Sequence, residues 1–198
     1  MAKLRGIVGI EAAIVLIAFV LVASALAFVA INMGMFSAQK SKEVMAKAYD
    51  TATRAIDVAG NALAHVDTTA SKVDVVVLPI KLSGGAAPID LANTTVAIMT
   101  SQGELNASLK SSSVSSATSD LAGLVTTAPG IAWASTGDTD ELLEPGEIVY
   151  LVVKPKTPLP AYGWIQIEVK PPVGSPLVVR YTIPPVLTHD WIDLVLGQ

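Results

Sequence analysis

The chain has no cysteine among its 198 residues. A disulfide framework and a thiolate metal site are therefore excluded, and a folded domain must be held by apolar burial and backbone hydrogen bonding. Histidine occurs twice, at His65 and His189, and no glycine-rich loop precedes a Lys-Ser or Lys-Thr pair. Because no nucleotide-binding motif or convergent catalytic set is visible, we expect no enzymatic activity, no cofactor and no metal site.

Basic residues are scarce in the larger part of the chain. Residues 61–198 carry seven Lys and Arg against thirteen Asp and Glu, whereas residues 1–60 carry six against four. An acidic domain argues against nucleic-acid binding, which needs a basic surface. Lys3 and Arg5 precede a long apolar run, so the positive-inside rule places the N-terminus in the cytoplasm and the acidic part outside.

Residues Ile7–Phe36 form that apolar run, in which Glu11 is the one ionisable side chain. The uncharged stretch Ala12–Ile31 has 20 residues. At a helical rise of ~1.5 Å per residue, it matches a hydrocarbon core of roughly 30 Å. A secretory signal would be shorter and would end in a small-residue cleavage site before a polar mature start. We therefore expect this segment to be retained and to be able to span a membrane.

Helical spacing continues beyond Phe36. The acid-before-base pairs Glu43 with Lys47 and Asp50 with Arg54 favour a solvated helix face. Apolar or small residues recur every three or four positions, at Met45, Ala48, Tyr49, Ala52, Ala55, Ile56, Ala59, Leu63 and Val66. The pattern predicts one helix over residues 7–66, about 90 Å long. A helix of that length needs neighbours.

The helical pattern ends near residues 67–71, where β-branched residues and turn formers take over. The clearest strand is Trp164–Lys170, in which Ile165, Ile167 and Val169 alternate with polar residues. The Ser-rich run 111–119 is expected to be an exposed loop, followed by a short helix at 120–125. The predicted strands are Val73–Ile80, Thr94–Thr100, Glu104–Lys110, Glu147–Lys154, Trp164–Lys170 and Pro176–Ile183.

These elements predict an α+β fold class. A long N-terminal hydrophobic α-helix is followed by a C-terminal domain, residues 67–198, built as an antiparallel β-sandwich or barrel of immunoglobulin-like type. Trp133, Trp164 and Trp191 are expected to pack in the core or at an interface. His65 is expected on the stalk or at the domain junction.

The N-terminal residues resemble those of a known family. A basic leader, Lys3–Gly6, is followed by Ile7–Val20 with the run Ile-Val-Leu-Ile-Ala-Phe-Val, and then by Ala27–Gly34. This sequence pattern resembles that of archaeal flagellins, also called archaellins. Bacterial pilins share the basic leader and the acidic residue near the new N-terminus, but not this run. The resemblance covers about the first third of the chain.

The resemblance implies a processing and assembly route. A prepilin-peptidase-like membrane protease would remove leader residues 1–6 by cutting between Gly6 and Ile7, in a site that includes Lys3 and Arg5. The chain would then be the structural subunit of the archaellum, an extracellular filament for swimming, assembled from a precursor in the cytoplasmic membrane. Assembly and rotation would need a separate ATPase and membrane platform.

Glu11 is the most informative assembly candidate, because a carboxylate in an apolar helix is costly in lipid unless it is paired. Cleavage would expose the α-amino group of Ile7 as its partner, in the same or an adjacent subunit; the alternative is an interfacial carboxylate without a role. Small residues would let helices pack closely, although alanine in a lone anchor needs no partner. The expected assembly residues are Ile7, Glu11, Ala12, Ala13, Phe19, Ser24 and Phe28.

Two N-glycosylation sequons lie in the external part, at Asn93-Thr94-Thr95 and Asn106-Ala107-Ser108. Glycosylation of Asn93 and Asn106 is chemically possible there, and the resemblance favours it. The acidic segment 138–147 offers carboxylates to a hard cation, but it lacks the regular spacing of a calcium loop. A solvated turn is the preferred interpretation of that segment.

Two other functions remain open at this stage. An adhesive pilus would use the same secretion route, with a β-domain that recognises a surface. A membrane-anchored binding domain would never polymerise. The N-terminal sequence pattern favours the archaellum over the adhesive pilus and over the membrane-anchored binding domain.

Overall fold

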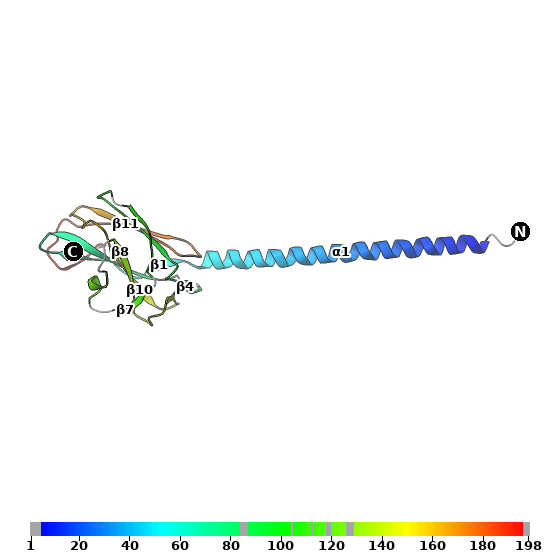
Figure 1. Cartoon of the computed structure of the whole chain (residues 1–198), viewed down its shortest axis with the longest axis horizontal. Helices are drawn as coiled ribbons and strands as arrows, with labels where there is room; N and C mark the ends of the chain where they lie inside the picture. Colours follow the sequence, from blue (N-terminus) through cyan, green and yellow to red (C-terminus); the bar gives the residue numbers. More distant parts are fainter. Residues whose placement is uncertain are drawn as a thin grey trace. The chain divides into compact units, whose positions relative to one another are not determined.

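The chain divides into two compact units, Met1–Ala48 and Tyr49–Gln198. One helix, α1 (Arg5–Thr53), forms the described part of the first unit and continues into the second, and Figure 1 shows it without a break. Its 49 residues correspond to a length of about 74 Å. Side chains are not described at residues 5–8, 50 and 107. The computed structural model describes residues 5–83, 87–103, 105–111, 113–117, 120–125 and 129–195.

Strands and one short 3-10 helix make up the remaining regular structure, which we call the outer domain. In chain order the elements are β1 (Ile56–Val58), β2 (Leu63–Asp67), β3 (Lys72–Leu82), β4 (Ile89–Asp90), β5 (Thr95–Thr100), β6 (Leu105–Leu109), β7 (Val114–Ser116), η1 (Ala122–Leu124), β8 (Gly130–Ser135), β9 (Leu142–Leu143), β10 (Ile148–Lys154), β11 (Trp164–Lys170), β12 (Leu177–Thr182) and β13 (Trp191–Asp193).

The outer domain has two main sheets. The larger runs β13-β2-β3-β10-β8-β7, with β1 also paired to β3, and the smaller runs β12-β11-β5-β6. A two-stranded ribbon, β4 with β9, completes the set. All these pairs are antiparallel except β7 with β8, which is parallel. The result is a sandwich of mostly antiparallel sheets.

One apolar core fills the space between the two sheets. Leu78, Leu151 and Trp133 contribute from the larger sheet, and Ile98 and Ile167 contribute from the smaller one. Each of these side chains is fully buried. Burying a side chain of this size contributes about 1.5–3 kcal/mol, so a chain without disulfides obtains its stability here.

The larger sheet is covered on its second face as well. Val75, Val77 and Val152 pack there with Val125, and the segment that includes η1 adds Leu121 and Leu124. A strand buried on both faces reads as a continuous apolar run instead of an alternating one. This burial explains the Val-Val-Val-Leu-Pro-Ile sequence within β3.

A proline interrupts the donors of β3 without weakening the sheet. β2 pairs with β3 as far as Val77, and β1 begins to pair at Ile80 on the same edge. The Pro79 carbonyl accepts a hydrogen bond from the Ala59 amide between these two strands. Within a strand, the N and O atoms of one residue point to the same side, so the missing N–H of Pro79 faces the gap where no ladder donor is needed.

The expected fold class is confirmed, with one long N-terminal helix followed by mostly antiparallel sheets. β11 has the predicted bounds, Trp164–Lys170, and its buried residues alternate as expected. The five other predicted strands correspond to β3, β5, β6, β10 and β12. The short helix expected at 120–125 is η1.

The prediction that the N-terminal helix reaches Val66 is wrong, because α1 ends at Thr53 and β1 and β2 follow. Ala62, Ala64 and Val66 are buried while Leu63 and His65 between them are half-buried, which is the period of a strand. The spacing of Ile56, Ala59, Leu63 and Val66 had matched a helix by coincidence. His65 therefore lies in a sheet and not on the stalk.

The expected loop at 111–119 also needs correction, because its middle forms β7. β7 joins the edge of the larger sheet beside β8 through backbone hydrogen bonds, which a Ser-rich sequence can make as well as any other. β8 was missed because Gly130–Ser135 is rich in small residues. The strands β4, β9 and β13 were missed because each has two or three residues.

Replacing Gly174 with Ala should strongly destabilise the outer domain. Gly174 has φ +116°, and an added Cβ would lie 2.1 Å from the Arg54 carbonyl oxygen, which accepts the Ser175 amide. Gly103 also has positive φ, but its added Cβ would meet nothing within 4 Å. We expect Gly103→Ala to cost about 1 kcal/mol and Gly174→Ala about 3 kcal/mol. Thermal unfolding followed by tryptophan fluorescence would measure both, and equal losses would contradict the steric account.

Candidate assembly surface

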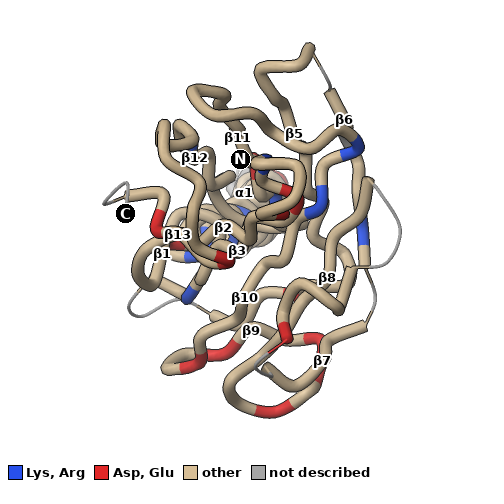
Figure 2. The backbone as a smooth tube through the Cα atoms, turned by 90° about the vertical axis from the view of Figure 1, so that its left-hand side faces the viewer, with Lys and Arg blue, Asp and Glu red and all other residues tan. Residues whose placement is uncertain are grey.

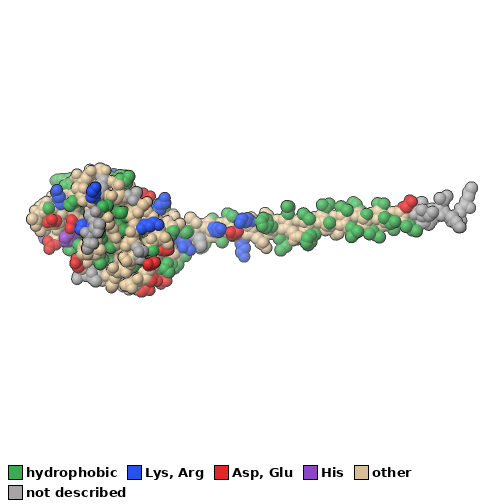
Figure 3. Space-filling model, viewed as in Figure 1, with side chains coloured by type: hydrophobic (Ala, Val, Ile, Leu, Met, Phe, Trp, Pro, Cys, Tyr) green, Lys and Arg blue, Asp and Glu red, His purple; other side chains and the backbone are tan. Residues whose placement is uncertain are grey.

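The side chains of α1 have almost no neighbours within the described chain. Residues 9–49 are all exposed, with Phe19 at 73% and Met33 at 72%. The helix is long and apolar enough to cross a membrane, with a mean hydropathy of 3.1 in its most apolar window and none of that window buried. Figure 3 shows hydrophobic side chains along the visible face of α1.

The apolar surface of α1 extends around the whole helix. Ile14, Val15, Leu16 and Ile17 follow one another and are all exposed. Successive residues are rotated by about 100°, so these four cover the full circumference. A helix that is hydrophobic all round belongs inside a membrane or inside a bundle of other helices. A single flat contact with one partner would leave most of this surface in water.

Glu11 lies among these apolar residues. Its side chain borders a shallow groove on the helix surface together with Ala12, Val15, Leu16 and Phe19. No hydrogen bond to its carboxylate is formed within the described chain. In lipid or in a dry helix bundle, this carboxylate would need a cation or a donor from elsewhere.

The expected assembly and cleavage residues lie as follows. Lys3 is outside the described residues, and Arg5, Gly6 and Ile7 lie in the first turn of α1 with their side chains undescribed. The Ser24 hydroxyl donates to the Leu21 carbonyl at 2.9 Å, which satisfies its one proton within the helix. The exposed members of the expected set are Glu11, Ala12, Ala13, Phe19, Ser24 and Phe28.

The charged section of α1 holds a small ion-pair network. Glu43 accepts hydrogen bonds from Lys40 at 2.8 Å and from Lys47 at 3.0 Å. The predicted pair of Glu43 with Lys47 is therefore confirmed. Exposed pairs of this kind contribute a few tenths of a kcal/mol each, so they mark where α1 is solvated more than they stabilise it.

The two sequons lie on neighbouring segments of the smaller sheet. Asn93 is exposed in the turn before β5, where its side-chain amide donates to Asp90 at 2.7 Å and its backbone amide donates to the same carboxylate at 3.0 Å. These two hydrogen bonds lower the pKa of Asp90, and the charge of Lys110 adds to the effect. Asn106 is half-buried in β6, opposite the buried Ile98.

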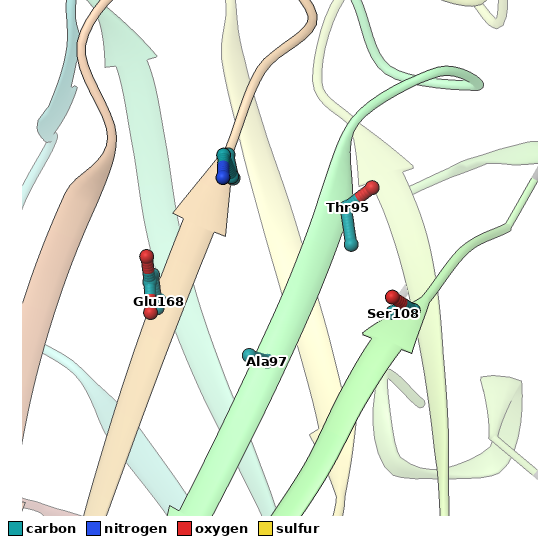
Figure 4. Close-up of a pocket in the computed structure, with 5 residues that line it drawn as sticks. Thr95, Ala97, Ser108 and Glu168 are labelled. Carbon is teal, nitrogen blue, oxygen red and sulfur yellow. The ribbon is translucent and has the colours of Figure 1, made fainter.

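Sequence analysis missed a groove on the outer face of the smaller sheet, shown in Figure 4. We call it the sheet groove. It has a volume of about 360 Å³ and is lined by Thr95, Ala97, Ser108, Glu168 and Lys170. These residues come from β5, β6 and β11. The alternation of β11 gave the outward direction of Glu168 and Lys170, but the grouping of all five requires the strand register.

The acidic segment 138–147 forms turns around β9, where Figure 2 shows several acidic residues along the backbone. Glu147 accepts from the Ser135 hydroxyl and from the Glu144 amide, and Asp140 accepts from the Leu142 amide. Carboxylates used in this way order a turn. Among the described residues, no group of three or more His, Asp and Glu side chains could hold a metal ion.

The tryptophans pack as expected. Trp133 is fully buried, whereas Trp164 is half-buried with the Arg180 guanidinium 4.2 Å from its ring centroid. Trp191 of β13 meets the His65 ring edge-on at 5.1 Å, and His65 Nδ1 lies 2.7 Å from the Asp74 carboxylate. His65 therefore joins the last strand of the domain to β2 and β3.

Replacing Asp90 with Asn should destabilise the turn before β5 in a pH-dependent way. Because the folded-state pKa of Asp90 is lowered, its contribution is present above the ordinary aspartate pKa and is lost as the pH falls through the folded value. We expect a loss of about 1 kcal/mol at pH 7, the difference between charged and neutral hydrogen bonds, which disappears in acid. Asp138→Asn makes the same charge change in an exposed turn and is the control. A pH-independent loss in unfolding experiments would refute this assignment.

Comparisons with known proteins show that nearly the whole chain is similar to flagellins. The protein described as "Probable flagellin 1" of Aeropyrum pernix is 45% identical over 93% of this chain and 94% of its own length. "Probable flagellin 2" of Archaeoglobus fulgidus is 30% identical over 93% of this chain and 92% of its own length. These matches extend well beyond the N-terminal third that carries the resemblance.

Two solved structures share the fold. The archaeal flagellum of Methanospirillum hungatei matches with a TM-score of 0.68 at 25% identity, covering 93% of this chain and 98% of that one. Crystalline flagellin FlaB1 from Methanocaldococcus jannaschii matches with a TM-score of 0.61 at 22% identity, covering 70% and 95%. Neither an adhesive pilus nor a lone membrane-anchored domain is favoured by these matches. The model of the archaeal-type flagellin family matches residues 6–181, and the chain belongs to that family.

Proposed function

We propose that this chain is the structural subunit of an archaellum and that it polymerises through α1 into an extracellular swimming filament. The observation that carries the proposal is the apolar surface around the circumference of α1 between residues 12 and 36, which has no partner within the described chain. Flagellin relatives over nearly the full length support the same function. A structural role also agrees with the absence of a nucleotide-binding motif in the sequence.

Lipid and neighbouring helices are equally apolar surroundings for α1, so the hydrophobic effect alone does not decide between membrane and filament. A membrane helix gains little hydrophobic energy by leaving lipid for a bundle, so close packing at small residues such as Ala12 and Ala13 must favour assembly. In water, the same surface strongly opposes dissociation, because each large apolar side chain contributes about 1.5–3 kcal/mol on burial. Repeated head-to-tail contacts that do not close into a ring then give a filament.

The precursor would be held in the cytoplasmic membrane by the segment that later forms the filament core. Lys3 and Arg5 would stay on the cytoplasmic side, and a prepilin-peptidase-like membrane protease would cut between Gly6 and Ile7. A separate ATPase and membrane platform would drive assembly and rotation.

N-terminal sequencing of purified filaments tests this processing step. We expect every subunit to begin at Ile7, because removal of residues 1–6 also removes the charges of Lys3 and Arg5 that hold the leader in the cytoplasm. Filaments whose subunits begin at Met1 or Ala2 would refute cleavage. Membranes from the same cells should still contain a fraction of the precursor.

Glu11 would pair with the α-amino group that cleavage exposes on Ile7, in the same subunit or in a neighbour. The pair would neutralise both charges as α1 leaves the membrane, since an isolated charge in the filament core would be costly. Ala12, Ala13 and Ser24 would allow close approach, while Phe19 and Phe28 would fill the spaces between helices.

Replacing Glu11 with Ala should leave leader cleavage intact and reduce filaments at least tenfold. The uncompensated Ile7 amine would remain in an apolar core, which costs several kcal/mol. Glu43→Ala removes an acidic residue from the solvated part of the same helix and is the matched control, expected to swim normally. Electron microscopy counts the filaments, and peptide mass measures cleavage. Normal filaments from the Glu11 variant would eliminate the proposed pairing.

A gene deletion with complementation tests the whole function. Cells that lack the chain should lose swimming and filaments while keeping attachment to surfaces, and the wild-type gene should restore both losses. Loss of attachment with swimming retained would identify an adhesive pilus instead. Single copies lodged in the membrane, without filaments, would contradict polymerisation.

A further inference from the structure

The two sequons share a feature that the sequence does not show. Each sequon ends in a hydroxyl residue, Thr95 in one and Ser108 in the other. Both of these residues line the sheet groove described above. In Figure 4, Thr95 and Ser108 lie on the adjacent strands β5 and β6. The hydroxyl residues of both sequons therefore meet at one depression on the outer face of the domain.

A bulge in the edge strand β6 places Ser108 in this position. Val96 pairs with Leu109 and Ile98 pairs with Asn106, so two residues of β6, 107 and 108, lie opposite Ala97 alone. Ser108 takes a left-handed backbone conformation with φ +64°. Bulges bend an edge strand and redirect a side chain. Here the bulge directs the hydroxyl of Ser108 towards the sheet groove.

The lining of the sheet groove suits a sugar ring. The methyl group of Ala97 offers a small apolar surface, against which the C–H face of a pyranose can pack. Around it stand two hydroxyl groups, the carboxylate of Glu168 and the ammonium of Lys170, which supply both donors and acceptors. A volume near 360 Å³ is at the small end of ligand sites, which fits the proximal part of a glycan.

Of the two asparagines, Asn93 is placed to supply that glycan. It is exposed in the turn before β5 and stands two residues before Thr95, which lines the sheet groove. Its side-chain nitrogen donates to Asp90 at 2.7 Å. A glycosylated amide keeps one N–H, so this hydrogen bond can persist and hold the linkage in one orientation. Asn106 is half-buried and pairs with the buried Ile98.

We propose that carbohydrate attached to Asn93 folds back into the sheet groove, with its first ring over Ala97 and between Thr95 and Ser108. The sheet groove is then a carbohydrate-binding site for the glycan of the same subunit. It needs little intrinsic affinity, because the covalent bond to Asn93 keeps the sugar at high local concentration. This inference rests on the proposed extracellular filament, since the acceptor must face outward.

Peptide mass spectrometry of wild-type filaments is the first test. Cleavage after Glu104 separates the two sequons into different peptides. We expect the peptide with Asn93 to carry the glycan. An unmodified Asn93 would refute binding of its glycan in the sheet groove. It would leave the proposed filament function untouched, because swimming and filament formation are scored separately on the same cells.

Sodium periodate then tests whether the sugar is seated. A ring held against the protein should be oxidised at least fivefold more slowly in intact filaments than in the released glycopeptide. Ala97→Gln fills the sheet groove without touching either sequon, so it should restore fast oxidation at unchanged occupancy. Met99→Gln changes the next outward residue of β5 and should behave as wild type. Equal oxidation rates in the filament and in the released glycopeptide would refute binding of the sugar in the sheet groove.

A density map of wild-type filaments decides the matter without any variant. We expect density that continues from the Asn93 side chain across Ala97 to Ser108. Density that projects away from the sheet, or that begins at Asn106, would refute the proposal. A neighbouring subunit's backbone in the sheet groove would also refute it and would assign the surface to subunit contacts.

Discussion

The apolar surface of α1 is the constraint on which the rest of the molecule depends. A helix with Ile14 to Ile17 exposed on successive sides cannot be satisfied by its own chain. In the proposed assembly route it exchanges one apolar surrounding for another, first lipid and then sister helices. The outer domain, in contrast, is complete in itself, with a core between its sheets and a second apolar layer under η1. The helix therefore needs partners to cover its apolar surface, whereas the outer domain buries its own.

Sequence reasoning was most accurate where one physical pattern acted alone. The uncharged stretch Ala12–Ile31 had no competing secondary structure to its helix, and β11 alternates cleanly because one of its faces is buried and the other is solvated. β3 was found despite burial on both faces, since a run of valines favours a strand. Local composition therefore sufficed for the helix and for the central strands.

The errors arose where tertiary pairing decides the outcome. Residues 56–66 are compatible with a helix by spacing, and they form strands because the edge of β3 is available to them. β7 has one apolar residue in its three, so no pattern could reveal its pairing with β8. The sheet groove was equally hidden, because Ser108 joins Thr95 through a bulge whose position only the register of β5 and β6 defines.

The pairing of β13 with β2 sets an order of events. Trp191–Asp193 lie far along the chain from β2, and they complete a sheet with this strand, which lies shortly after the end of α1. A contact between such distant segments cannot form before residue 193 has been synthesised, and such non-local pairing is slow. The N-terminal segment emerges first and can enter the membrane while the remainder is still unfolded. In the proposed assembly route, anchoring would thus precede closure of the sandwich, and the chain would cross the bilayer before it has a compact domain to obstruct its passage.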